Sequence, residues 1–151
     1  MNTPNFNEFP EVWGPHYWFF LHTVAFAYPN HPNEITKKKF YDLIQNMPVF
    51  IPDPKMGSEF IHILDDYPVQ PYLDSRTTLV EWVHYIHNVF NMRLGHPAVD
   101  MNMFLVQYWE KYKKIEVKQE NNKRWLKVLM FMSILSVGCC IGYLHLNRVK
   151  N

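Results

Sequence analysis

Apolar residues recur at spacings of three and four along the first hundred positions, and no segment keeps the alternation of a half-buried strand. Residues 33–47 show the helical pattern clearly, because Asn33 is a favoured N-cap residue and the apolar side chains that follow share one face: Phe40, Leu43, Ile44 and Met47. The pattern predicts four helices, over about residues 15–28, 34–47, 56–66 and 75–94. Short connections between amphipathic helices favour antiparallel neighbours, so we expect an all-α four-helix bundle.

The expected helix ends follow from local residue preferences. Pro15 suits a first helical position, Asp74 or Ser75 suits the N-cap of the fourth helix, and Gly95 followed by Pro97 suits its end. Residues 1–12, which are polar and rich in Asn and Pro, are expected to form a flexible arm, and a short fifth helix is expected after Asp100. The side chains expected to face inward from the third and fourth helices are Phe60, Ile61, Leu64, Leu79, Trp82, Val83, Ile86 and Phe90.

A long apolar run without charge, VLMFMSILSVGCCIGYL, extends from Val128 to Leu144. With Leu146 it gives a helix of roughly 26 to 29 Å, enough to cross the hydrocarbon layer of a bilayer. We therefore expect a transmembrane helix over 128–146, after a charged linker or helix over 110–127 and before a short tail, 147–151. The Lys and Arg residues that precede the run favour a tail-anchored protein with a cytoplasmic globular domain.

Composition narrows the function further. The net charge is +1 and no basic stripe runs through the first hundred residues, which argues against a nucleic-acid partner. Both cysteines, Cys139 and Cys140, lie in the apolar run, so the globular part has no disulfide framework and no thiolate-rich metal site. The aromatic content of 17% suits either dense core packing or a core that also binds a flat apolar ligand.

Polar side chains accompany the apolar stripe of the fourth helix. His87, Asn91 and Leu94 share one side of it, with His84 one turn earlier, and His22 of the first helix follows Trp18 by four residues. Each histidine alone is typical of a partly buried residue that is satisfied by its neighbours. Together these residues predict a cleft that binds an aromatic cofactor. A zinc site at His84 and His87 lacks further converging ligands, so no metal is expected.

Two motifs carry a family resemblance. The segments WGPHYWFFLHTVAFAYP and EWVHYIHNVFNMRLGHP, the second with the spacing W-x4-H-N-x2-N-x2-L-G-x-P, resemble the Erv/ALR family of FAD-linked sulfhydryl oxidases over roughly Trp13 to Asp100. The resemblance implies a four-helix bundle with a short extra helix, over 13–109, that is often dimeric and holds FAD. It implies flavin contacts at Trp18, His22, Tyr28, Trp82, His87, Asn88, Asn91 and Leu94, and contacts to the nucleotide phosphates at Arg93 and His96.

The same resemblance places the redox CxxC of the family at Asp53 and Met56. A carboxylate and a thioether perform no thiol–disulfide exchange, and a negative charge at Asp53 would oppose reduction of a neighbouring flavin. Natural loss, deliberate replacement and an error in the recorded residues all remain open as the origin of this change. Two functions are therefore expected to compete: a sulfhydryl oxidase of protein thiols whose catalysis is in doubt, and an inactive structural or interaction protein. Small single-span members of this kind resemble those of large DNA viruses, which implies a virion inner membrane or capsid location.

Overall fold

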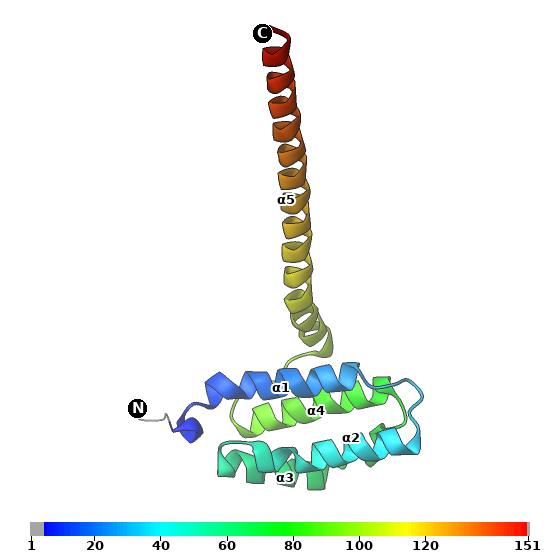
Figure 1. Ribbon diagram of the computed structural model, residues 1–151. Coiled ribbons are helices and arrows are strands. Elements are labelled where there is room, and N and C mark those ends of the chain that lie inside the picture. Colours follow the sequence, from blue (N-terminus) through cyan, green and yellow to red (C-terminus); the bar gives the residue numbers. More distant parts are fainter. Residues whose placement is uncertain (1–4, 151) are drawn as a thin grey trace. The chain divides into compact units, whose positions relative to one another are not determined.

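A computed structural model describes residues 5–150, and within these residues all regular structure is helical, as predicted (Figure 1). The chain divides into two compact units, Met1–Val99 and Asp100–Asn151. The first unit contains four α-helices and three short 3-10 helices: η1 Phe6–Glu8, α1 Pro10–Phe26, α2 Glu34–Asn46, η2 Met47–Phe50, α3 Pro54–Asp66, η3 Gln70–Tyr72 and α4 Arg76–Arg93. Helices α1 and α4 lie side by side, with α2 and α3 next to them (Figure 1).

Helix α1 begins earlier than predicted. It starts at Pro10, where the missing N–H of proline costs nothing, so Pro15 lies inside the helix rather than at its start. The carbonyl of Glu11 loses its intrahelical donor to Pro15, but both residues are exposed and water can replace that bond. Residues 10–12 of the predicted arm are therefore helical, and residues 1–4 lie outside the described residues.

Side-chain caps fix the starts of the other three helices. Asn33 caps α2, as predicted, and Ser75 rather than Asp74 caps α4. Helix α3 begins two residues before the predicted Met56 because Asp53 is its N-cap: one carboxylate oxygen accepts the N–H groups of Lys55 and Met56, at 2.7 and 3.2 Å. An N-cap of this kind stabilises a helix by about 0.5 to 2 kcal/mol.

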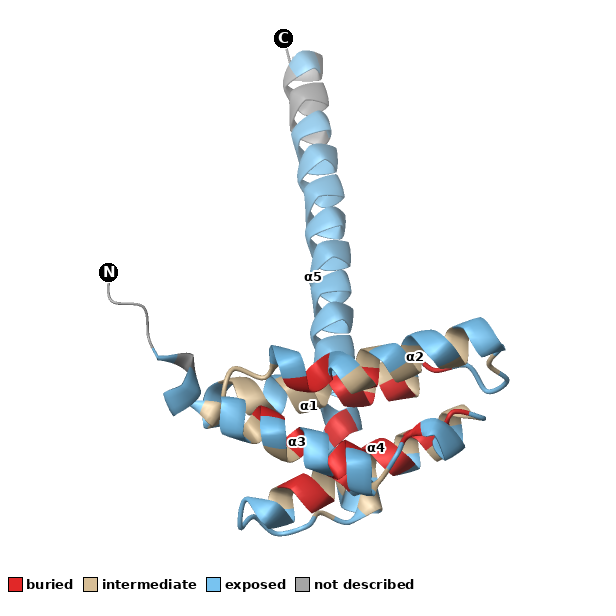
Figure 2. Ribbon diagram, turned by 90° about the horizontal axis from the view of Figure 1, so that it is seen from below, coloured by how far each residue is buried: buried red, intermediate tan, exposed pale blue. Residues whose placement is uncertain are grey.

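The core lies between the facing sides of these helices (Figure 2). The predicted inward residues of α4 are all buried. On α3 the prediction for Ile61 is wrong, because Ile61 is 48% exposed and Ile63 is fully buried in its place. Phe60, Ile63 and Leu64 follow the i, i+3, i+4 spacing of one helix face, whereas Ile61 is turned about 100° away from Phe60.

The second unit contains one long helix, α5 Met101–Lys150, with its first N–H groups accepted by the carboxylate of Asp100. The predicted short fifth helix is therefore not a separate element, because residues 110–127 take the helical alternative and join it to the apolar run. Among the described residues, one stretch of 41 residues in this helix, Met101–Ile141, contains a segment long and apolar enough to cross a membrane, with mean hydropathy 1.6. The side chains at 142–147, where the predicted span ends, and residue 151 of the predicted tail lie outside the described residues.

Candidate functional site

Two histidines meet where α1 packs against α4. The Nε2 atom of His22 lies 3.0 Å from Nδ1 of His87, a hydrogen bond in which one imidazole donates and the other accepts. His22 is 2% exposed, while His87 is half-buried. The structure thus brings together two residues, 65 positions apart, that the sequence predicts to share a site.

Aromatic rings surround this pair on one side. The ring of Trp18 stacks on that of His87, with centroids 4.0 Å apart and planes 11° from parallel. Its edges meet Phe60 of α3 and Phe90 of α4 at 5.9 and 5.7 Å in the T-shaped arrangement that aromatic pairs favour. We call Trp18, His22, Phe60, His87 and Phe90 the Trp18 cluster. Three of the four helices contribute to it, so the cluster exists only in the folded bundle.

The environment of His87 keeps its ring neutral. Burial lowers the pKa of His87 from 6.5 to about 4, and a positive charge at His84 would lower the pKa further. At neutral pH this imidazole therefore offers one N–H donor and one acceptor nitrogen rather than a charge. The Trp18 cluster is consequently an aromatic surface with uncharged hydrogen-bonding atoms.

Asn88 holds the segment that follows α4. Its side-chain amide donates to the carbonyl of Val99 and accepts the Val99 N–H, both at 2.9 Å, and His84 Nε2 lies 3.0 Å from the same carbonyl. Both polar ends of the Asn88 amide are used in this way. The structure therefore places Asn88 as the residue that positions loop 94–99, and its amide does not face the Trp18 cluster as a spare ligand group.

The start of loop 94–99 is held by the end of α4. Gly95 has φ +78°, a left-handed conformation that closes the helix at the predicted position, and the N–H of His96 donates to the carbonyl of Asn91 at 2.8 Å. Asn91 is half-buried, and Leu94 and His96 are exposed. The structure thus presents the side chains of Leu94 and His96 to solvent on a loop fixed at both ends.

Arg93 is already paired within the bundle. Its guanidinium donates to Glu59 at 2.6 Å and to Asp66 at 2.7 Å, and these hydrogen bonds raise the pKa of Arg93. The contacts tie the end of α4 to α3. Arg93 can reach a phosphate group only by leaving these two carboxylates, neither of which stood out in the sequence because their helix positions are ordinary exposed ones.

Two other predicted flavin contacts lie in the core. The hydroxyl of Tyr28 donates to the carbonyl of Leu73 at 2.7 Å, and the indole N–H of Trp82 donates to the carbonyl of Tyr67 at 3.1 Å. Both side chains are at most 2% exposed. They therefore stabilise the connections before α4, and the structure gives them no contact with the Trp18 cluster in its ring packing.

The positions aligned with the family CxxC lie at the start of α3. Met56 is half-buried against the core and precedes Phe60, a member of the Trp18 cluster, by one helical turn. Gly57 follows it because a Cβ there would lie 2.9 Å from the carbonyl oxygen of Pro48. Asp53 and Met56 thus occupy the helix start nearest in sequence to the cluster, with one residue as cap and the other as packing. The described residues contain no group of three or more His, Cys, Asp or Glu side chains placed to hold a metal ion.

Comparison with known proteins adds independent findings. The sequence model of the Erv1 / Alr family matches residues 15–113. A probable FAD-linked sulfhydryl oxidase of Acanthamoeba polyphaga mimivirus is 37% identical over 87 residues, covering 57% of this chain and 61% of that protein. The mitochondrial FAD-linked sulfhydryl oxidase erv1 of Schizosaccharomyces pombe is 30% identical over 109 residues, covering 71% of this chain and 57% of that one.

Solved structures agree on the fold. The yeast Erv1 core has a TM-score of 0.61 at 24% identity, covering 72% of this chain and 86% of that one. The FAD-binding domain of Erv1 from Saccharomyces cerevisiae has a TM-score of 0.57 at 28% identity, covering 67% and 90%. The architecture of packed helices is therefore shared with both.

Proposed function

Because the chain belongs to the Erv1 / Alr family, we propose that its helical domain binds FAD but lacks the thiol relay that delivers electrons to the flavin. The two halves of this proposal rest on different residues. FAD binding rests on the Trp18 cluster and loop 94–99, and the missing relay rests on Asp53 and Met56.

The stacked pair Trp18 and His87 is the observation that carries FAD binding. An isoalloxazine ring needs aromatic or apolar faces and a few hydrogen-bonding atoms at its edge, and this cluster supplies both. A ring does not fit between Trp18 and His87, whose centroids are 4.0 Å apart, so it would pack on their partly exposed side. A neutral His87 suits this task because it binds without introducing a buried charge.

Loop 94–99 would hold the rest of the nucleotide. His96 is exposed on a segment fixed by Asn88 and Asn91, so its imidazole is available to a phosphate without breaking an ion pair of the bundle. We assign the phosphate role to His96 ahead of Arg93, whose binding would first require separation from Glu59 and Asp66. Asn91 and Leu94 complete the proposed contact surface, whereas Tyr28, Trp82 and Asn88 support it indirectly.

The thiol side of the reaction has no residue to perform it. Bound FAD accepts an electron pair and passes it to oxygen, but a client dithiol needs a disulfide sulfur to attack. The only cysteines in the sequence are Cys139 and Cys140, inside the apolar run. Asp53 instead caps α3, and its carboxylate would disfavour an anionic reduced flavin nearby.

The experiment measures flavin and activity on the same sample. The full chain, purified in detergent and incubated with FAD, is expected to retain about one flavin per chain after gel filtration, with the yellow absorption of a bound flavin. It is expected to consume no oxygen with dithiothreitol beyond free FAD. Bound flavin with rapid dithiothreitol oxidation would overturn the proposal that the relay is missing.

A second candidate function is a structural or interaction protein on a membrane that no longer binds flavin. Its support is that several family ligand positions are satisfied inside the protein, namely Asn88 by Val99 and Arg93 by Glu59 and Asp66. A chain that stays colourless after incubation with FAD, yet remains helical, would favour this candidate.

We further propose that α5 anchors the domain in a membrane with the domain on the cytoplasmic side, since Lys and Arg are enriched before the apolar run. Relatives occur in mimivirus and in Invertebrate iridescent virus 3, which supports a location in a virion membrane or capsid. Protein thiols, if the activity exists, and capsid or membrane proteins are the proposed partners. Protease digestion of sealed vesicles tests the orientation, because a domain inside the vesicle would be protected.

A further inference from the structure

Helix α5 carries one uncharged stripe that the rest of the described chain leaves exposed. From Ile115 it advances by alternating steps of four and three residues, through Ile115, Gln119, Asn122, Leu126, Leu129, Ser133, Ser136 and Cys140. We call these residues the α5 seam, and every one of them is exposed. A repeat that averages 3.5 residues keeps one side of a helix facing a partner helix around which it winds.

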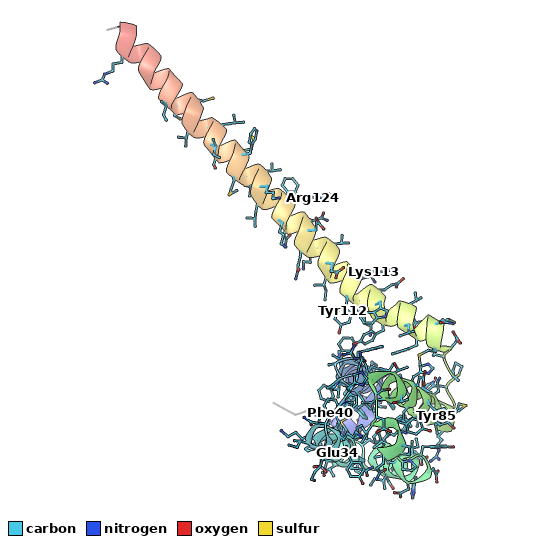
Figure 3. All side chains as sticks on the ribbon, turned by 90° about the vertical axis from the view of Figure 1, so that its right-hand side faces the viewer. Glu34, Phe40, Tyr85, Tyr112, Lys113 and Arg124 are labelled. Atoms are coloured by element: carbon cyan, nitrogen blue, oxygen red, sulfur yellow. The ribbon has the colours of Figure 1, made fainter. Side chains whose placement is uncertain are left out.

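Charged residues avoid the seam where they are densest. Residues 110–127 contain ten Asp, Glu, Lys and Arg residues, and none of them lies at a seam position. The opposite side of the helix carries Glu120, Arg124 and Lys127 instead, and Figure 3 labels Arg124 among the side chains that project from this part of α5. A helix that served only as a lipid anchor would need no uncharged face in its water-exposed part.

Within the apolar run the seam residues are small. Ser133, Ser136 and Cys140 stand among larger side chains such as Met132 and Leu135. Small residues let two helix backbones approach closely in lipid, where packing rather than the hydrophobic effect drives association. The serine hydroxyls donate within the helix, to the carbonyls of Met130 and Ser133 at 2.7 and 2.8 Å, so they need no water in the membrane.

We propose that the α5 seam binds a second copy of this chain, as a parallel helix pair that runs from the charged segment into the membrane. Two copies in one membrane share an orientation, so each seam residue meets its own counterpart at the same height. The side-chain amides of Gln119 and Asn122 each donate and accept, which makes them complementary to themselves, and an Asn in such a seam fixes the register. A different protein would need the same order of polar, large and small residues. This inference rests on α5 crossing a membrane and is independent of flavin binding.

A competing face exists on the other side of the helix. Gly138 and Gly142 form a G-x-x-x-G pair, which also promotes helix pairing in membranes. Followed toward the domain, however, this face leads to Arg124 and Lys127, where two parallel copies would place like charges against each other. The α5 seam is therefore the face that stays compatible with pairing along its whole length.

The two native cysteines report which face is paired. Cys140 lies on the seam and Cys139 is turned about 100° away from it. The full chain in lipid vesicles, oxidised with copper phenanthroline and analysed on a non-reducing gel, is expected to give covalent dimer several-fold faster in the Cys139→Ser variant than in Cys140→Ser. Equal rates would indicate random collision, and a faster rate through Cys139 would indicate another face; either result overturns the proposal.

A matched pair of substitutions outside the membrane tests the seam a second time. Ile115 on the seam and Val117 off it are 55% and 61% exposed, and both follow the same charged surroundings. In the Cys139→Ser background, Ile115→Glu is expected to slow cross-linking several-fold, because it opposes two carboxylates, while Val117→Glu leaves the rate unchanged. An unchanged rate in Ile115→Glu, or loss of cross-linking in Gly138→Leu alone, would refute the seam. Circular dichroism confirms that each variant keeps its helix, and the flavin content of the same samples is a separate readout.

Discussion

Restoring two cysteines at positions 53 and 56 tests whether sulfur is what the site lacks. The double variant Asp53→Cys with Met56→Cys removes the carboxylate that accepts the N–H groups of Lys55 and Met56. Loss of that cap costs about 0.5 to 2 kcal/mol. Truncating the half-buried Met56 adds about 1 kcal/mol, as expected for part of a core methionine. The variant should therefore be less stable by about 1.5 to 3 kcal/mol, which urea unfolding measures.

The new thiols would gain reactivity from their position. The first stands at the N-cap of α3, where the helix dipole and free N–H groups lower a thiol pKa, and the second lies one turn before Phe60 of the Trp18 cluster. With FAD bound, we expect oxygen-dependent oxidation of dithiothreitol that the unmodified chain lacks, followed with an oxygen electrode. The control is Asp53→Ser with Met56→Ser, which keeps a capping hydroxyl and adds no sulfur. A folded variant that holds FAD and forms the disulfide, yet consumes no oxygen, would refute the reasoning.

Three further predictions concern the bundle. Gly57→Ala should destabilise it by about 1 to 3 kcal/mol, measured by urea unfolding, because its Cβ would lie 2.9 Å from the Pro48 carbonyl oxygen; Gly14→Ala, with open space around it, should not. Since the pKa of His87 is lowered to about 4, the unfolded chain binds the extra proton below pH 6.5, so stability should fall from pH 6.5 to 4, by at most about 3 kcal/mol, and stay flat above; His87→Phe should remove most of this slope, and an unchanged slope would exclude His87 as its source. Trp18→Ala should release FAD at least ten-fold more readily in equilibrium dialysis, whereas Trp13→Ala, outside the Trp18 cluster, should retain it.

Much of the fold follows from short-range preferences that a single sequence displays. The caps at Asn33 and Ser75, the stop at Gly95 and the inward face of α4 depend on neighbours within one or two turns, so they were predictable. The start of α1 was not, because Pro10 and Pro15 both suit a first turn and only the packing of the whole helix selects between them.

The site was predictable in its members more than in their tasks. His22 and His87 were expected to meet because of their helix positions and the family resemblance, and they do. The tasks of Asn88, Arg93 and Asp53 depend on partners 11, 34 and two or three residues away, whose distances in space no periodicity reveals. In Asp53 the same residue that removes a redox sulfur also supplies a helix cap, a dual effect that becomes visible only with the backbone N–H groups of α3 in place.

The central claim is that the Trp18 cluster still binds a flavin without redox sulfur beside it. The most direct test is the absorption spectrum of the full chain after incubation with FAD and removal of the excess, together with the flavin-to-protein ratio of His87→Phe. The claim predicts about one bound FAD per chain and clearly less in the variant. A helical, folded chain with no bound flavin would contradict it.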